Sequence, residues 1–196
     1  MNRLMAVAVL TAGGLLLRQQ MKKNATGSSG RMSTVTESID VNVPLSTAYN
    51  QWTQFEDFPR FMAGVLEVRQ LDDAHLLWRA EIGGQREEWT AEITHQIPDR
   101  LIAWRSVSGA RNGGAVSFQR LGDDRTRVEL RIDYAPRGAV EAIGDALGAV
   151  SARAKGNLRR FKSFLEDRGR ETGAWRGTVA SPQDQARVAP ALGAPM

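Results

Sequence analysis

The chain has 196 residues, of which 42% are hydrophobic and none is cysteine. This length suits one globular domain with tails, and the lack of cysteine excludes a disulfide framework and a thiolate metal site. The formal net charge of +4 is concentrated in residues 1–32, which carry five basic residues and no acid; the rest has 21 basic residues against 22 acids. A nearly neutral body gives no basic surface for nucleic acid, so no nucleic-acid partner is expected.

The N-terminal segment is apolar and basic. Residues 4–17 form an apolar run, which is shorter than the about 20 residues that a membrane-spanning helix needs. Basic residues then stand where a signal peptide would need small residues for cleavage: Arg18, Lys22 and Lys23. We therefore expect membrane contact through residues 4–23, as an uncleaved anchor that holds a cytoplasmic body at the inner face of the membrane. The alternatives are a disordered leader and an upstream extension ahead of a start at Met32.

Composition divides the chain into three parts. Residues 1–32 are the N-terminal segment and its linker, which is rich in Gly and Ser over 24–30. Periodic hydrophobicity covers residues 33–169, which we predict to be the folded domain. Residues 170–196 lose this periodicity and become rich in Ala, Pro and Gly, so we predict a disordered tail.

The folded domain begins with a strand and two short helices. Apolar residues alternate with polar ones over 35–43, which predicts a half-buried strand that Pro44 ends. Ser46 can cap a helix that carries Tyr49 and Trp52. Asp57 can cap a second short helix, in whose first turn Pro59 is tolerated.

Six more strands follow in quick succession. Alternation and turn residues predict them at 65–71, 76–82, 87–94, 101–106, 115–121 and 126–134. The pair Gly83-Gly84 between two alternating runs indicates a hairpin. We predict that the glycine-rich stretch 109–114 is a mobile loop.

A long helix ends the domain. Apolar residues recur at helical spacing from Val140 to Leu165, with acids near the start and basic residues near the end, an order that complements the helix dipole. The basic cluster is either a solvated helix end or a contact for anionic lipid or an acidic partner. The element order predicts an α+β fold: a curved antiparallel sheet of about seven strands around a long C-terminal helix, with two short helices after the first strand.

Several motifs in this order resemble a known family. They are Ile-Asp-Val-Asn-Val-Pro at 39–44, Ala48-Tyr49, Trp52, Phe-Glu-Asp-Phe-Pro-Arg-Phe-Met at 55–62, Glu88-Trp89 and Ile-Ala-Trp-Arg-Ser at 102–106. Over roughly 34–168 the chain resembles the polyketide cyclase/dehydrase family of the START/SRPBCC superfamily, which shares the helix-grip fold of the major birch pollen allergen. It is also similar to coenzyme Q-binding START proteins. The resemblance implies a cavity between sheet and long helix that receives a hydrophobic molecule, and it implies no single reaction.

The residues expected to line this cavity are largely apolar. The set comprises Phe58, Phe61, Met62, Trp78, Glu87, Trp89, Trp104, Phe118, Tyr134, Ile143 and Leu147. The alternative is that the rings simply fill the core, which suits Tyr49 and Trp52 best.

Two residues are weak candidates for acid/base catalysis. Glu87 shares a strand face with Trp89, and Arg79 or Arg105 on adjacent strands could pair with it; a rim position is the alternative. His95 ends the same strand, and a surface position suits it better than a catalytic one. His75 and His95 are not at metal-ligand spacing, so no metal and no cofactor are expected.

The sequence favours a binding protein over an enzyme. The leading hypothesis is that the domain binds a lipid, an isoprenoid or a quinone-like compound, as a carrier or chaperone at a membrane. One alternative is a cyclase or dehydratase that acts on a polyketide-like substrate. Another is a non-catalytic structural or stress-related interaction protein. The sequence does not give the oligomeric state.

Overall fold

The computed structural model describes residues 32–82, 84–135 and 143–180. The expected anchor at 4–23, the linker and residues 181–196 of the expected tail lie outside these ranges. The described elements are β1 (Ser33–Val41), α2 (Leu45–Trp52), η1 (Phe55–Arg60), β2 (Val65–Gln70), β3 (His75–Ile82), β4 (Gln85–Ile97), β5 (Leu101–Gly109), β6 (Asn112–Gly122), β7 (Arg125–Tyr134) and α3 (Ile143–Glu166). None of the helices in the described ranges combines the length and apolar composition that a bilayer crossing requires.

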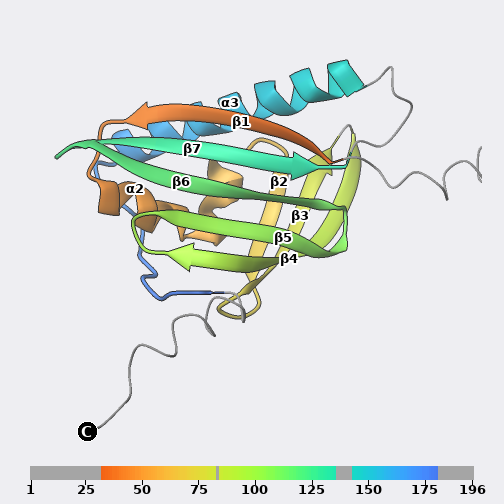
Figure 1. The fold of residues 1–196 in the computed structure, drawn as a ribbon, viewed down its shortest axis with the longest axis horizontal. Helices are drawn as coiled ribbons and strands as arrows, with labels where there is room; N and C mark the ends of the chain where they lie inside the picture. Colours follow the sequence, from red (N-terminus) through yellow and green to blue (C-terminus); the bar gives the residue numbers. More distant parts are fainter. Residues whose placement is uncertain (1–31, 83, 136–142, 181–196) are drawn as a thin grey trace, which may run out of the picture. The chain divides into compact units, whose positions relative to one another are not determined.

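The strands form one curved antiparallel sheet of seven strands in the order β1-β7-β6-β5-β4-β3-β2. Figure 1 shows α3 along one side of this sheet, next to β1, with α2 and η1 at one end. The predicted α+β class and the helix-grip arrangement are therefore confirmed.

Each strand turns alternate residues toward the concave face. In β1, Val35 and Val41 are buried, and their partners Ile132 and Thr126 on β7 lie on the same face. Asp40 points the other way and forms ion pairs with Arg125 and Arg127 on the convex face. The apolar residues that alternate with polar ones in the sequence are thus the residues buried on the concave face.

The glycine-rich stretch 109–114 differs from its prediction as a mobile loop. β5 runs to Gly109 and β6 starts at Asn112, so a tight hairpin connects them. Gly109 has a φ of +73°, a conformation that glycine adopts without steric cost.

The two predicted short helices exist, but their caps differ. α2 begins directly after Pro44, whose carbonyl accepts from the Ala48 amide at 3.1 Å, and no side chain caps it. The predicted cap by Ser46 is therefore wrong. η1 is a 3₁₀ helix with Pro59 inside it, and Asp57 lies in its first turn instead of capping it.

One half of the space between sheet and helices is densely packed with aromatic rings. The Trp52 ring lies within 4.8–6.4 Å, between centroids, of the rings of Phe58, Phe61, Phe118 and Phe161. These rings and the residues Ala154, Leu158, Phe161 and Leu165 of α3 are buried. This packed half is the hydrophobic core of the domain.

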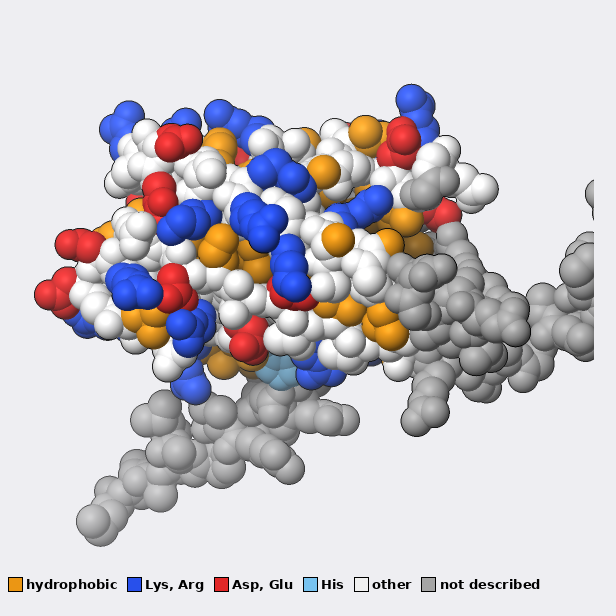
Figure 2. Space-filling model, turned by 90° about the horizontal axis from the view of Figure 1, so that it is seen from above, with side chains coloured by type: hydrophobic (Ala, Val, Ile, Leu, Met, Phe, Trp, Pro, Cys, Tyr) orange, Lys and Arg blue, Asp and Glu red, His pale blue; other side chains and the backbone are white. Residues whose placement is uncertain are grey.

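Basic and polar side chains of α3 hold this helix between the two edges of the sheet. On the β1 side, Lys162 Nζ donates to the Asp40 carbonyl at 2.8 Å. On the η1 side, Arg160 Nε donates to the Phe61 carbonyl at 2.9 Å, and Asn157 accepts from the Ala63 amide. Figure 2, which views the molecule from the side of α3 and β1, shows many Lys and Arg side chains there. Part of the basic cluster therefore attaches the helix to the sheet.

Residues 171–179 form an ordered segment, which we call the strap. Val179 pairs with Gln96 of β4 as an antiparallel bridge, and Arg176 forms an ion pair with Asp99 at 2.6 Å. The predicted disordered tail from 170 is therefore wrong over this stretch.

The strap satisfies buried polar groups of α2 and the residue that follows it. Gln51, which is 0% exposed, exchanges hydrogen bonds with Thr172: its amide oxygen accepts from the Thr172 N–H at 2.9 Å, and its Nε2 donates to Thr172 Oγ1 at 3.1 Å. Thr53 Oγ1 accepts from the Trp175 amide at 3.0 Å. The strap thus gives the buried Gln51 amide oxygen a donor and gives Gln51 Nε2 an acceptor in addition to Asp57 Oδ2, which explains why a segment without hydrophobic periodicity is ordered.

Candidate functional site

One region of the concave face packs against the core through Trp78, Trp104 and Ile132. Here the apolar residues are half-buried, in contrast to the fully buried residues of the core. We call this region the open half and define it by Trp78, Trp89, Trp104, Ile132 and Tyr134.

Strand register brings the open half together from four strands. Trp78 of β3 pairs with Trp89 of β4, and their rings stack with centroids 5.6 Å apart and 11° between planes. The Trp78 ring also lies 5.6 Å from the Phe58 ring, which connects the open half to the packed core. Two of the predicted lining residues are therefore one rigid aromatic unit.

Trp104 lies across the neighbouring strand because that strand carries a glycine. Trp104 of β5 pairs with Gly114 of β6, and Gly114 pairs with Ile132 of β7. A Cβ on Gly114 would stand 2.7 Å from Trp104 Cζ2, so any side chain there would displace the indole. The glycine thus allows a flat ring against the sheet.

The apolar stripe of α3 is less buried toward the start of the helix. Along the apolar stripe of α3, Ala154 and Leu158 are buried, whereas Leu147 and Val150 are half-buried. Ile143 lies in the first turn of α3, and its side chain is outside the described part of the structure. The stripe therefore turns from core into accessible apolar surface toward the start of the helix.

Two buried polar atoms of the open half have no hydrogen-bond partner among the described residues: Trp78 Nε1 and Tyr134 Oη. An unsatisfied buried polar group costs about 1–3 kcal/mol, so such groups usually have a partner. Burial raises the pKa of Tyr134 above its ordinary value, which keeps the phenol protonated and able to donate at neutral pH. The open half therefore combines an apolar surface with two buried polar atoms, a typical composition of small-molecule sites.

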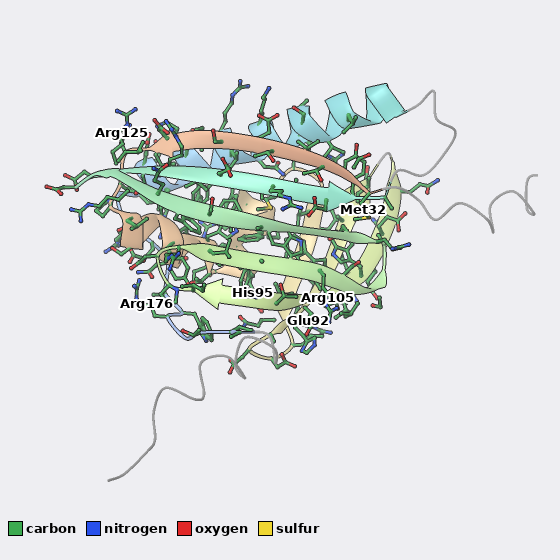
Figure 3. All side chains as sticks on the ribbon, viewed as in Figure 1. Met32, Glu92, His95, Arg105, Arg125 and Arg176 are labelled. Atoms are coloured by element: carbon green, nitrogen blue, oxygen red, sulfur yellow. The ribbon has the colours of Figure 1, made fainter. Side chains whose placement is uncertain are left out.

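Glu87 lies on the same concave face. It pairs across the hairpin with Ala80, a buried residue, and alternates with Glu88. The suggested partners Arg79 and Arg105 are wrong, because both lie on the convex face. There Arg79 binds Glu67 and Glu88, while Arg105 binds Glu92 (Figure 3).

His95 is separated from the site by a β-bulge. The register between β4 and β5 shifts between Ile93 and His95, so Ile93 pairs with Trp104 while His95 pairs with Ala103. Ala103 points away from the concave face, and His95 therefore also lies on the convex side (Figure 3). His95, which was a candidate for acid/base catalysis, therefore does not lie in the open half.

Four of the other predicted lining residues belong to the packed half. Phe58, Phe61, Met62 and Phe118 are all buried among other core residues. Their side chains fill space, and the Phe58 ring contacts Trp78 of the open half.

Glu37 of β1 is a concave-face carboxylate that the sequence analysis did not include. It accepts a short hydrogen bond from Ser151 of α3, and Lys155 Nζ lies 3.6 Å away. The alternation of β1 placed Glu37 on the inward face, which was the available signal. Its partners show that it attaches α3 to β1.

A separate cleft of about 460 Å³ lies between the strap and η1. Its lining consists of Thr53, Gln54, Phe55, Glu56, Asp57, Gln70, Thr172, Ala174 and Trp175. Most of these side chains are polar, so this cleft suits an apolar ligand less well than the open half.

Comparison with known proteins gives consistent matches. Residues 41–162 match the family model described as polyketide cyclase / dehydrase and lipid transport. An uncharacterized 17.2 kDa protein of Streptomyces lincolnensis, from the melC2-rnhH intergenic region, is 52% identical over 149 residues, which cover 76% of this chain and 99% of that protein.

Solved structures share the fold. The Zhui aromatase/cyclase of Streptomyces sp. R1128 has a TM-score of 0.62 at 18% identity, covering 74% of this chain and all of that one. The protein DR_A0006 of Deinococcus radiodurans has a TM-score of 0.55 at 27% identity, covering 70% and 99%. A START superfamily protein of Mycobacterium smegmatis has a TM-score of 0.54 at 18% identity, covering 69% and 95%.

Proposed function

Because the chain belongs to the polyketide cyclase/dehydrase and lipid transport family, we propose that it binds a hydrophobic small molecule against the open half of its sheet. The observation that carries this proposal is the contrast within the concave face. Trp78, Trp89 and Trp104 remain half-buried there, while equivalent positions in the other half are fully packed. Half-buried tryptophans on an inward face are available to a ligand that α3 would help to cover.

The apolar surface is sufficient for useful affinity. Removing about 300 Å² of apolar ligand surface from water contributes several kcal/mol, at about 25 cal/mol per Å². The loss of translational and rotational freedom offsets part of this gain. The stacked pair of Trp78 and Trp89 is already rigid, so little further ordering is required.

The experiment that tests the proposal is native mass spectrometry of protein purified from its own host, combined with a fluorescence titration of anilinonaphthalene sulfonate. We expect a co-purifying apolar molecule, and about tenfold weaker probe binding in Trp104→Ala, as truncation of a central contact residue predicts. Trp175→Ala on the strap is the matched control and should bind like the wild type. A protein that is always empty and does not bind the probe would exclude the proposal.

A second candidate function is cyclisation or dehydration of a polyketide-like substrate. It is favoured by the position of Glu87, an acidic residue on the same concave face as Trp89. A carboxylate there could accept a proton from a bound substrate. Glu87→Gln should abolish turnover if the protein is an enzyme and change ligand affinity only modestly if it is a carrier.

We also propose that the N-terminal segment brings the domain to a membrane, the natural source of apolar ligands. The support is the sequence itself, with an apolar run at 4–17 and a charge of +5 over residues 1–32. Deleting residues 1–31 should move the protein from the membrane fraction to the soluble fraction. Equal distribution of both forms would disprove this role.

A further inference from the structure

The outer face of α3 carries positive charge that the described carboxylates neutralise only in part. Residues 147–165 of this helix include five basic residues and no acidic one, and Figure 2 shows Lys and Arg side chains on this side of the molecule. Lys155 and Lys162 lie near the carboxylates of Glu37 and Glu166. Among the described side chains, no carboxylate forms an ion pair with the three arginines of this stretch: Arg153, Arg159 and Arg160.

The convex face of the sheet shows the opposite pattern. Four arginines there each form an ion pair with a neighbouring carboxylate, at distances of 2.6–3.0 Å: Arg79, Arg105, Arg127 and Arg131. Carboxylates of the sheet thus neutralise these arginines, whereas the arginines of α3 keep their charge for an anion outside the described domain.

The basic residues of α3 lie on both flanks of the helix. Arg153 and Arg160 donate to backbone carbonyls on the side of β3 and η1, at 3.3 Å and 2.9 Å. Arg159 follows Lys155 by four residues, so both lie on the flank beside β1. Because backbone carbonyls carry no net charge, the contacts of Arg153 and Arg160 position the guanidinium groups and leave their charge in place.

The remaining exposed positions of α3 carry small side chains. Within residues 147–166, every exposed residue is either basic or one of Gly148, Ala149, Ala152 and Ser163. Protein interfaces usually bury a large aromatic or aliphatic anchor at their centre, and this stretch of α3 exposes none. An anionic bilayer needs no such anchor, since its surface attracts each nearby basic residue by charge alone.

From these observations we infer that the outer face of α3 is a docking surface for an anionic lipid bilayer. Arg153, Arg159 and Arg160 bind the lipid phosphates, which a guanidinium group can contact through two parallel hydrogen bonds. The inference goes beyond the membrane role proposed for the N-terminal segment, because this surface belongs to the folded domain.

Sedimentation with vesicles tests the charge requirement. The full chain is mixed with vesicles of phosphatidylcholine alone, or of phosphatidylcholine and phosphatidylglycerol in equal parts. We expect tighter binding to the anionic vesicles. Arg153→Gln combined with Arg159→Gln should weaken this binding about 25-fold, since each basic residue near an anionic surface contributes about fivefold.

The matched control removes the same charge from the convex face. Arg79→Gln combined with Arg105→Gln should change binding to the anionic vesicles by less than about twofold, because charges more than about 10 Å from the bilayer are screened at 0.1 M salt.

A fluorescent label tests the orientation of the docked domain without an affinity measurement. The chain has no cysteine, so a single one can be introduced at an exposed serine and labelled with nitrobenzoxadiazole. Ser163→Cys places the label on the outer face of α3, and Ser38→Cys places it on the convex face of β1. On anionic vesicles we expect brighter emission at shorter wavelength from the label at position 163, and no change at position 38.

The outcomes separate this inference from the other proposals. If the chain binds vesicles while both labels stay in water, or the Arg153 and Arg159 variant binds like the wild type, the inference is wrong and the N-terminal segment alone provides membrane contact. If polyglutamate shields the label at position 163 and anionic vesicles do not, the partner is an acidic protein and the inference is also wrong. If the chain binds neither kind of vesicle, both membrane proposals fail, whereas titration with anilinonaphthalene sulfonate still tests ligand binding separately.

Discussion

At the scale of single residues, the open half depends on the lack of a side chain at position 114. Gly114 has the Trp104 ring above it and the Arg131 carbonyl oxygen beside it, 2.2 Å from where a Cβ would stand. The backbone oxygen cannot move away as the end of a flexible side chain could. Gly114 is therefore required for the close approach of Trp104 to the sheet.

We predict that Gly114→Ala lowers the free energy of unfolding by about 1–3 kcal/mol, because the added methyl group overpacks the concave face. Urea unfolding followed by tryptophan fluorescence measures the change. Gly148→Ala is the matched control: a Cβ there meets no atom within 4 Å on an exposed part of α3. It should stabilise the protein by about 0.5–1 kcal/mol. Equal effects of the two substitutions would contradict this account of Gly114.

At the scale of elements, the strap replaces solvent as the hydrogen-bonding partner of α2. Thr172 Oγ1 donates to Asp57 at 2.5 Å and accepts from Gln51. Arg176 also reaches the Asn50 side-chain oxygen at 2.9 Å. These contacts join the end of the chain to the residues that precede the aromatic core.

We predict that Thr172→Val lowers the free energy of unfolding by about 1–3 kcal/mol, because it keeps the side-chain shape and removes two hydrogen bonds, one accepted from the buried Gln51 Nε2 and one donated to Asp57. Thr178→Val is the control, since Thr178 is exposed on the same strap. Chemical denaturation of both variants measures the difference. Identical midpoints would show that the strap contacts contribute nothing to stability.

The strands were predictable from the sequence, whereas the strap was not. Alternation and turn residues located all seven strands, since a half-buried strand must alternate. The strap is held by side-chain hydrogen bonds to partners such as Gln51, which is 121 residues away from Thr172, and such bonds leave no periodic signal.

The candidate site was predictable in part, for the same reason. Alternation on β3, β4 and β5 predicted that the tryptophans of the open half face the concave side. The bulge between Ile93 and His95 shifts the register of β4, and no residue pattern in the sequence predicted this bulge. His95 therefore moved to the convex face, although alternation alone left its position open.

At the scale of the whole molecule, two carboxylates at the strap make stability depend on pH. Burial opposes ionisation of Asp57, but hydrogen bonds from Thr172, Arg60 and Gln51 outweigh it and hold the pKa below its ordinary value of 3.8. Burial likewise opposes ionisation of Glu171, and the hydrogen bond from Asn50 contributes most to holding its pKa below the ordinary 4.5. Both carboxylates thus favour the folded state when they are ionised.

A lowered pKa in the folded state means that the stabilisation is fully present above the ordinary pKa and is lost as pH falls through the lower, folded value. We predict that the wild-type protein loses stability between about pH 5 and about pH 3, and that Asp57→Asn loses less over the same interval because one of the contributing carboxylates no longer titrates. Thermal unfolding followed by circular dichroism at a series of pH values measures both. Parallel curves for the two proteins would exclude a contribution from Asp57.

The pairing of β1 with β7 has a consequence for the synthesis of the protein. Thr34 and Asp133, which face each other in this pairing, are 99 residues apart in the chain. At about 5–20 residues per second, the ribosome needs about 5–20 s to produce the second strand after the first. During this time the nascent β1 has no strand to pair with, and its hydrogen-bonding edge is open to other chains. The polar residues that alternate along β1 limit such association, and the speed of translation between the two strands determines how long the risk lasts.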